Sequence, residues 1–286
     1  MLAGFQPISG AARLAGVIGW PVAHSLSPRL QGFWLREHQI DGAYVPLAVE
    51  PDDFSASLRA LSSCGFAGVN VTIPHKEAAF ALCDELTEDA RAIGAVNTVT
   101  FDKSGRLKGH NSDGFGFLEN LKQGAPTWRP DESPALILGA GGAARAIIYV
   151  LLKAGVPEIR LTNRTRARAE KLATEFGSSQ VVEWEERAVA ARECGLLVNT
   201  TSLGMTGMES LDFNLDNLPK AAVVTDIVYK PLKTELLADA RAKGNPTVDG
   251  LGMLLHQARP GFEAWFGASP NVSDELRSFV LAGLTR

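Results

Sequence analysis

A short apolar run followed by a glycine-rich turn is the feature that most constrains the fold of this chain. Residues 135–138 read ALIL, the run GAGGAA follows at 139–144, and an alanine-rich helix is predicted over 143–154. The run fits the G-x-G-x-x-G/A pattern, with alanine in the last place. Such glycines let the backbone approach a pyrophosphate, and the next helix offers free N–H groups at its N-terminus. The segment therefore predicts a dinucleotide-binding domain, although a purely structural strand-to-helix turn is the alternative.

Strand-like and helix-like segments alternate along the whole chain. In the first part, strands are predicted at 14–18, 43–49, 68–73 and 96–101, with helices at 28–38 and 52–63. After the glycine turn, strands are predicted at 158–162, 196–199 and 223–227, and helices at 250–266 and 273–281. Helices that separate consecutive strands imply parallel pairing, because parallel strands need a crossover connection.

Length and one proline-containing connection indicate two domains. The chain has 286 residues, which is long for one domain, and residues 123–134 contain three prolines among mixed polar residues. We expect an α/β protein with an N-terminal α/β substrate domain that has a mainly parallel sheet. It would comprise residues 1–112 plus 250–286, whose helices pack back onto it. Residues 113–249 would form a Rossmann-like, doubly wound dinucleotide-binding domain.

Composition and charge argue against several classes of protein. Hydrophobic residues make up 45% of the chain and charged residues 21%, which suits ordinary folded cores rather than disorder. The net charge of −4 gives no electrostatic reason to expect nucleic acid or an anionic membrane as a partner. No apolar run is long enough to span a bilayer, and the N-terminus lacks a secretory signal.

The cysteines indicate a reducing compartment. Cys64, Cys83 and Cys194 are odd in number and contain no close pair. This spacing argues against a disulfide framework and against a zinc site. We therefore expect a cytoplasmic protein with no bound metal.

Polar residues at the end of one predicted strand suggest a substrate site. The alternation of the run NVTIPHK, residues 70–76, stops at Pro74, and a lysine follows at 76. Asn70, Thr72 and Lys76 could then gather at one strand end and face a polyol or an acid. Asp113, in the polar turn at 111–114, could pair with that lysine. Taken singly, Lys76 could be a solvated lysine at a helix start and Asp113 a helix N-cap.

Two serines near the start of the chain could bind a carboxylate. Ser25 and Ser27 are spaced by two residues on a segment predicted to be extended, so their hydroxyls point the same way. Because Pro28 follows, Ser27 could instead, or also, cap the helix predicted at 28–38.

The residues after the strand at 158–162 favour NADP over NAD. Asn163, Arg164 and Thr165 stand where an acidic residue would hold a ribose 2′-hydroxyl. Arg164 can form a planar fork on a 2′-phosphate, and Thr165 and Arg168 can add donors. A lone arginine at a helix start is more often a surface residue, but its position after the second strand favours the phosphate.

Nine motifs, in order over nearly the whole chain, resemble those of the shikimate dehydrogenase family. They read GWPVAHSLSP, GVNVTIPHKE, GAVNTV, HNSDG, LGAGGAARA, TNRT, VNTTSLGM, DIVYKPLKT and DGLGMLLHQA. The resemblance implies an NADP(H)-dependent oxidoreductase that reversibly reduces 3-dehydroshikimate to shikimate, in the shikimate pathway of aromatic amino-acid biosynthesis. It implies a small-molecule substrate and a monomer or homodimer.

The resemblance also implies roles for individual residues. Ser25 and Ser27, with the hydroxyl of Tyr229, would bind the substrate carboxylate. The ring hydroxyls would be held by Asn70, Thr72, Asn97, Asp113 and Gln257. Lys76 and Asp113 would be the catalytic pair, with Lys76 transferring the proton and Asp113 orienting it. The cofactor would be bound by Gly139, Ala140, Gly141, Gly142, Ala143, Asn163, Arg164, Thr165 and Arg168, with Met205 and Gly250 near the nicotinamide.

Two other functions are compatible with the same motifs. A quinate/shikimate dehydrogenase that prefers NAD would have nearly the same site, although serines at both 25 and 27 and the Arg164 motif favour shikimate and NADP. A non-catalytic dinucleotide-binding sensor is the second alternative. It predicts loss of Lys76 or Asp113, and both residues are present.

Overall fold

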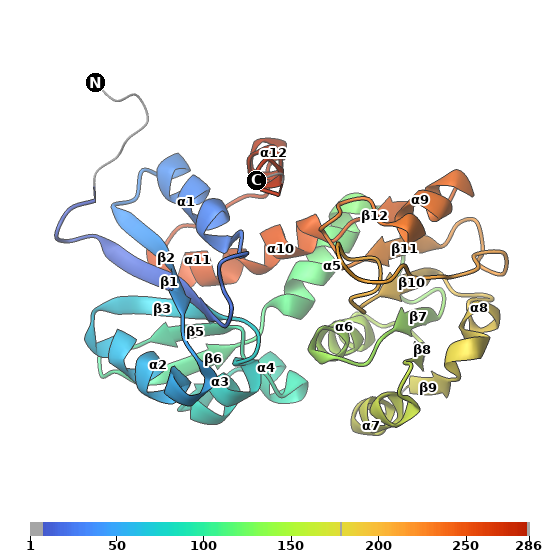
Figure 1. The fold of residues 1–286 in the computed structure, drawn as a ribbon, viewed down its shortest axis with the longest axis horizontal. Helices are drawn as coiled ribbons and strands as arrows, with labels where there is room; N and C mark the ends of the chain where they lie inside the picture. The colour runs from blue at the N-terminus through green and yellow to red at the C-terminus, as the bar shows by residue number, and fades with distance from the viewer. Residues whose placement is uncertain (1–7, 178, 285–286) are drawn as a thin grey trace. The chain divides into compact units, whose positions relative to one another are not determined.

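The chain divides into two compact units in the computed structural model, which describes residues 8–177 and 179–284 (Figure 1). The first unit contains residues 1–112 and 257–286, and the second contains residues 113–256. The expected second boundary lay at 249/250, whereas the contacts place residues 250–256 with the second unit.

A six-stranded sheet forms the centre of the first unit, in the order β2-β1-β3-β5-β6-β4. The strands are β1 (Arg13–Gly19), β2 (Gly42–Ala48), β3 (Phe66–Val71), β4 (Glu85–Leu86), β5 (Thr98–Phe101) and β6 (Leu107–His110). β1 is parallel to β2 and β3, and β4 is parallel to β6. The sheet is therefore mainly parallel, as the sequence predicts.

Strand β5 departs from the parallel pairing expected for the strand at 96–101. It is antiparallel to both β3 and β6. A tight turn joins β5 to β6, in which Asp102 N–H donates to the Arg106 carbonyl and Gly105 has a φ of 82°. Two strands joined by a short turn must run in opposite directions. The expectation of parallel pairing requires a helix between consecutive strands, and no helix separates β5 from β6.

Helices cover both faces of this first sheet. They are α1 (Ser27–Glu37), α2 (Phe54–Ser63) after the short 3-10 turn η1 (Pro51–Asp53), α3 (Lys76–Leu82), α4 (Glu88–Ile93), α11 (Arg259–Phe266) and α12 (Asp274–Leu281). On one face, Phe54, Leu58, Ala79 and Ala90 join one buried cluster with residues of β3. Elsewhere in the unit, α11 contacts β1, β3 and β5.

The helix expected over 250–266 is two helices. α10 (Leu251–Gln257) ends before Ala258, and α11 starts at Arg259 with Pro260 in its first turn. Proline has no N–H to continue the hydrogen-bond ladder of a preceding helix, and its ring crowds the turn before it. The break also coincides with the boundary between the two units, since Gln257 falls in the first.

The second unit has an all-parallel sheet in the order β12-β11-β10-β7-β8-β9. Its strands are β7 (Ala135–Leu138), β8 (Ile159–Thr162), β9 (Ser179–Val182), β10 (Leu196–Asn199), β11 (Val223–Asp226) and β12 (Thr247–Val248). Counted from β7, the order is that of a doubly wound dinucleotide-binding domain, which confirms the predicted fold class. β9 and β12 were not predicted, because they are short and partly polar.

Both faces of the second sheet are buried. Its helices are α5 (Asp113–Gly124), α6 (Gly142–Lys153), α7 (Arg166–Phe176), α8 (Arg187–Ala190), α9 (Glu235–Ala242) and α10, with the 3-10 turn η2 (Trp184–Glu186). Along β7, Ala135 and Ile137 join the cluster made with α5, α6 and α7, and Leu136 and Leu138 join the cluster made with α9. Figure 1 shows α6 and α7 on one side of β7 and β8, with α8 and α9 on the other.

Candidate functional site

A tight turn places Lys76 directly after the end of β3. Thr72 N–H donates to the Ile18 carbonyl at 2.9 Å, which extends the pairing of β3 with β1 by one residue. His75 N–H then donates to the Thr72 carbonyl at 2.9 Å, and α3 begins at Lys76. The Lys76 carbonyl accepts from Val96 N–H at 3.0 Å, which fixes the start of α3 next to the segment that carries Asn97.

Asn70 lies on β3 and is 5% exposed. Its Oδ1 accepts a hydrogen bond from the Tyr44 hydroxyl at 2.6 Å. Its Nδ2 donates to the Asn97 carbonyl at 3.1 Å and to Thr98 Oγ1 at 3.2 Å. Because both amide hydrogens are used within the protein, the remaining lone pair of Oδ1 is what Asn70 can offer to a ligand. Toward a ring hydroxyl, Asn70 is therefore an acceptor.

Asn97 and Gln257 belong to the same hydrogen-bond network. Asn97 Oδ1 accepts from Ser112 N–H at 2.9 Å and from Thr98 Oγ1 at 2.9 Å. Its Nδ2 donates to Ser112 Oγ at 3.1 Å and to Gln257 Oε1 at 3.5 Å. Ser112 Oγ donates to the Gln257 carbonyl at 2.8 Å. The structure thus brings Asn70, Asn97 and Gln257 together through buried and part-buried contacts of the first unit.

The two serines lie at the start of α1, in a different arrangement from the expected cap. Ser27 is the first residue of α1, and the cap position belongs to Leu26, which makes no side-chain cap. Ser27 N–H donates to Ser25 Oγ at 3.3 Å. The prediction that Ser27 caps the helix is therefore wrong, because Ser27 is already the first helical residue and the cap position lies one residue before it. The Ser27 side chain instead hydrogen-bonds Tyr44.

Tyr44 is a residue of this network that the sequence did not single out. Burial raises the pKa of Tyr44 well above its usual range, and the Ser27 hydrogen bond opposes that shift. The phenol therefore stays protonated and links Ser27 to Asn70. The sequence shows Tyr44 only as an aromatic residue of β2, and the order β2-β1-β3 is needed to place it. Thr98 and Ser112 were also missed, although each stands inside a motif next to a predicted residue.

Asp113 is the first residue of α5 and is 9% exposed. Its partner in the predicted catalytic pair, Lys76, belongs to the other unit, so the pairing stays a prediction.

The glycine turn is shaped as an open cradle at the carboxyl end of β7. Gly139 has a φ of 109°, and a Cβ there would lie 2.6 Å from Thr200 Oγ1, so only glycine fits. Gly141 and Gly142 are exposed, and a Cβ on either would meet no atom within 4 Å. Gly141 occupies the cap position of α6 without a side-chain cap. The first N–H groups of α6 are thus available to an anion, which fits the pyrophosphate of a dinucleotide.

Cationic side chains follow β8 where a 2′-phosphate is expected. Arg164, Thr165 and Arg168 are exposed, and Asn163 Nδ2 donates to the Thr165 carbonyl at 2.9 Å. Within the part of the chain that the structure describes, neither Arg164 nor Arg168 forms a salt bridge. Arg166, between them, pairs with Glu170 at 2.7 Å and with Glu183. Two unpaired guanidinium groups at this position fit a phosphate dianion.

Met205, Tyr229 and Gly250 belong to the second unit, on the segments that follow β10, β11 and β12. Thr206 N–H donates to the Lys230 carbonyl at 2.8 Å, so the first two loops touch. Burial raises the pKa of Tyr229. A Cβ on Gly250 would lie 2.3 Å from the Ile227 carbonyl oxygen. With the glycine turn, these residues occupy the carboxyl edge of the parallel sheet, where open α/β sheets bind ligands.

Three family models match the chain in sequence order. Residues 17–99 match the shikimate dehydrogenase substrate binding domain, and residues 125–228 match the shikimate/quinate 5-dehydrogenase model. Residues 250–274 match the shikimate 5′-dehydrogenase C-terminal domain. The chain is also 61% identical over 276 residues to the shikimate dehydrogenase (NADP(+)) of Paramagnetospirillum magneticum, covering 96% of this chain and 100% of that one. The chain belongs to the shikimate dehydrogenase family.

Solved structures of family members have the same fold. The shikimate 5-dehydrogenase of Thermus thermophilus in complex with NADP(H) and shikimate superposes with a TM-score of 0.83 at 39% identity, covering 96% of this chain and 98% of that one. The quinate dehydrogenase of Corynebacterium glutamicum in complex with NAD gives a TM-score of 0.88 at 31% identity, covering 95% and 99%. Shikimate dehydrogenases and a quinate dehydrogenase thus share this architecture.

Metal clusters, membrane-spanning helices and disulfides are absent from the residues that the structure describes. Across residues 8–177 and 179–284, no group of three or more His, Cys, Asp or Glu side chains could hold a metal ion. No helix in that part of the chain is long and apolar enough to cross a bilayer. Cys64, Cys83 and Cys194 are all free thiols.

Proposed function

We propose that this chain is an NADP-dependent shikimate dehydrogenase that reversibly reduces 3-dehydroshikimate to shikimate. The observation that carries the proposal is the hydrogen-bond network of the buried Asn70 and Asn97 with the partly buried Gln257, beside Lys76. It concentrates amide and hydroxyl groups suited to a polyhydroxylated ring at one strand end. The open glycine turn of the second unit supplies the matching cofactor site, and membership of the family assigns the reaction.

Different residues would bind different groups of the substrate. Ser25 and Ser27, with Tyr229, would bind the carboxylate, and Thr72 and Asp113 would join the amides at the ring hydroxyls. Asn70 accepts a hydrogen bond from a ring hydroxyl, because its own hydrogens are already used. Asn97 can donate to a ring hydroxyl by giving up its contact with Gln257 Oε1, which at 3.5 Å is long for a hydrogen bond.

Lys76 carries the proton in this proposal. When bound, NADPH supplies the hydride that the carbonyl carbon of 3-dehydroshikimate takes up. Lys76 Nζ gives a proton to the carbonyl oxygen in the same direction, and takes it back from the hydroxyl during oxidation. The Asp113 carboxylate would orient the ammonium and accept a hydrogen bond from a neighbouring hydroxyl. The balance is one hydride and one proton gained by the substrate for each NADPH oxidised.

NADP is the cofactor that the second unit fits best. Arg164 and Arg168, with the hydroxyl of Thr165, present donors after β8, and no carboxylate stands where a ribose 2′-hydroxyl would be held. Each lost charge-assisted hydrogen bond to the phosphate costs about 1.5 to 3 kcal/mol, or about 10- to 100-fold in affinity. NAD should therefore be the poorer substrate.

A steady-state assay that crosses shikimate and quinate with NADP and NAD tests this function. We expect kcat/KM for shikimate with NADP to exceed each of the other three combinations by about tenfold or more. Higher kcat/KM with quinate and NAD would instead assign the quinate dehydrogenase activity. Binding of NADPH without turnover of either acid would identify a dinucleotide-binding sensor.

We infer a cytoplasmic location and a monomer or homodimer. The three free cysteines suit a reducing compartment, and the polar substrate is a soluble metabolite. Light scattering of the purified protein would determine the oligomeric state, and a higher oligomer would contradict this expectation.

A further inference from the structure

Asp226 is a buried carboxylate at the end of β11 to which the catalytic scheme gives no role. It is 1% exposed. Its Oδ1 accepts from Val228 N–H and Asn199 Nδ2, each at 3.0 Å, and its Oδ2 accepts from Thr234 Oγ1 at 2.8 Å. Burial raises the pKa of Asp226, and these three hydrogen bonds oppose the shift. None of the three donors is a cation, so a carboxylate here carries a desolvation cost that a neutral residue would avoid.

Asn199 is the register partner of Asp226 on the neighbouring parallel strand and is also fully buried. Its Nδ2 donates both to Asp226 Oδ1 and to the Leu203 carbonyl, the latter at 3.2 Å. Its Oδ1 accepts from Thr201 N–H at 3.0 Å and from Thr201 Oγ1 at 2.7 Å. Asn199 therefore fixes the loop after β10 and connects it to Asp226.

Asp226 does the same for the loop after β11. Val228 N–H lies at the start of that loop, and Thr234, which caps α9 through Leu237 N–H, lies at its end. Because Asp226 accepts hydrogen bonds from both residues, it holds the two ends of this loop together. The hydrogen bond from Thr206 N–H to the Lys230 carbonyl joins the two loops a second time.

We propose that Asp226 is a positioning residue, which holds the β10 and β11 loops at a fixed spacing so that Met205 meets the nicotinamide and Tyr229 meets the substrate carboxylate together. This inference rests on the function proposed above, because it takes the roles of those two residues from it. Asp226 touches neither ligand and acts through the loops. A carboxylate suits this position because it offers acceptors to three donors at once. An amide would present its NH₂ group to Thr234, so the hydroxyl, which already accepts from Leu237 N–H, would have to accept a second hydrogen bond and would lose the acceptor for its own hydrogen.

Three variants separate positioning from general stability. In Asp226→Asn, Oδ1 can keep the Asn199 and Val228 contacts, but the contact to Thr234 is disturbed. Thr234→Val removes the same hydroxyl from the other side, and Thr234→Ser restores it. We expect Asp226→Asn and Thr234→Val to lose about 10- to 100-fold in kcat/KM for shikimate, as for a small misplacement of binding groups. Thr234→Ser should keep the parent kcat/KM.

Two readouts distinguish this result from a folding defect. Adenosine 2′,5′-bisphosphate, a fragment of NADP that lacks the nicotinamide, should bind Asp226→Asn as tightly as the parent. Hydrogen exchange should accelerate in Asp226→Asn at both 200–206 and 227–234, and the Tm at pH 7 should not fall, because the variant buries a neutral group.

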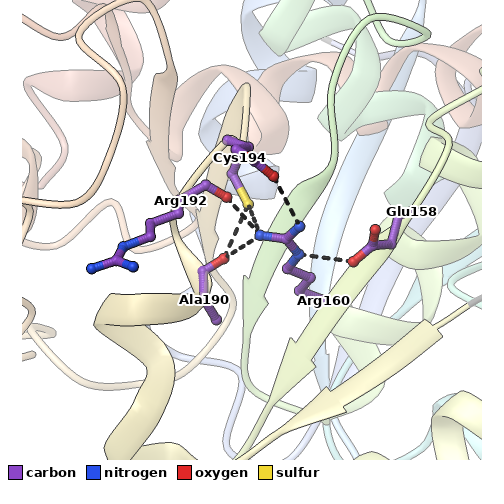
Figure 2. A network of polar contacts seen from close by, with 6 residues as sticks. Glu158, Arg160, Ala190, Arg192 and Cys194 are labelled. Atoms are coloured by element: carbon purple, nitrogen blue, oxygen red, sulfur yellow. Dashed lines mark hydrogen bonds and ion pairs between the residues drawn. The ribbon is translucent and has the colours of Figure 1, made fainter.

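Arg160 provides the matched control in the same unit. Its guanidinium donates to the carbonyls of Ala190 and Arg192 at 2.9 and 2.6 Å and to Glu158 at 2.8 Å, as Figure 2 shows. Arg160→Met removes a comparable set of bonds from the segment before β10. It should lower the Tm and raise exchange near 190–194, with kcat and KM unchanged.

The outcomes are distinct. Parent kinetics in Asp226→Asn and Thr234→Val, or faster exchange in only one of the two loops, would overturn the positioning role. So would a loss of bisphosphate binding together with a fall in Tm. A parent enzyme that turns over neither acid would overturn the proposed function instead, and the exchange data would still decide whether Asp226 couples the loops.

Discussion

Tyr44 shows how one phenol can organise a polar site without being a predicted ligand. Its hydroxyl donates to Asn70 at 2.6 Å and is hydrogen-bonded by Ser27, so it connects a proposed carboxylate contact to a proposed hydroxyl contact. Both neighbours are buried, so the phenol meets them away from bulk water.

Replacing Tyr44 by phenylalanine should weaken substrate binding rather than chemistry. The change leaves Asn70 Oδ1 and the Ser27 hydroxyl without a partner, which costs about 1 to 3 kcal/mol when the groups are buried. We expect the KM for shikimate to rise about fivefold or more, with kcat and the KM for NADP near the parent values. Tyr149→Phe, on α6 of the second unit, is the control. An unchanged KM for shikimate would refute the link.

Removing the Lys76 amine should affect the chemical step itself. Lys76→Ala is expected to lower kcat by about 10²- to 10⁴-fold, the usual contribution of a positioned acid–base group, with KM near the parent value. Lys108→Ala is the control, because Lys108 is an exposed lysine of the same unit that pairs with Glu85 at 2.8 Å. If Lys76→Ala keeps most of the parent kcat in a steady-state assay, Lys76 is not the proton donor.

At the scale of elements, the packing of α11 on the first sheet depends on one glycine. A Cβ on Gly68 would lie 2.1 Å from both the Val99 carbonyl oxygen and Trp265 Nε1. Trp265 Nε1 itself donates to that carbonyl at 3.1 Å. The helix therefore sits on β3 and β5 at a point where no side chain fits.

A pair of glycine-to-alanine variants tests this packing. Gly68→Ala should lower the free energy of unfolding by about 2 to 3 kcal/mol, because the backbone of β5 cannot move aside. Gly32→Ala, in the middle of α1 where a Cβ meets no atom within 4 Å, should raise it by about 0.5 to 1 kcal/mol. Urea denaturation measures both. Equal effects of the two substitutions would contradict the close contact of α11 with β3.

The elements that the sequence predicted well are those with one dominant local signal. β7 and β10 have the predicted limits because each contains a short apolar run that follows a proline or a glycine and ends at a glycine or an asparagine. The single helix predicted at 250–266 and the cap predicted at Ser27 were wrong. The hydrophobic pattern does not show that Pro260 starts a new helix, or which of two neighbouring residues takes the cap position. The antiparallel direction of β5 comes from the tight turn that joins it to β6, which the alternation of predicted helices and strands did not include.

For the whole molecule, the second unit has the features of an independent folding unit. Residues 113–256 are one uninterrupted segment with a complete parallel sheet and a buried cluster on each face. The first unit is assembled from two segments of the chain.

A fragment of residues 113–256 should therefore fold alone. We expect it to unfold cooperatively on heating and to bind adenosine 2′,5′-bisphosphate, which calorimetry can measure. The same fragment with Arg164→Ala should melt at the same temperature but bind the bisphosphate about 10-fold or more weakly, because a charge-assisted contact is lost. A fragment without a melting transition, or with equal binding by both versions, would contradict the prediction.

The sequence by itself determined the fold class, the glycine turn and the family, because these depend on local patterns that are continuous along the chain. The roles expected for Lys76, Asp113 and Arg164 come from the same motifs and await the kinetic tests. Only the tertiary structure showed that Tyr44 joins Ser27 to Asn70, that Asn70 can only accept, and that Asp226 ties two loops together. These contacts join residues that are distant in sequence, and the order of the strands in each sheet brings them together. A motif can be recognised from consecutive residues. Whether a side chain still has a free donor or acceptor depends on every polar group that the fold places near it.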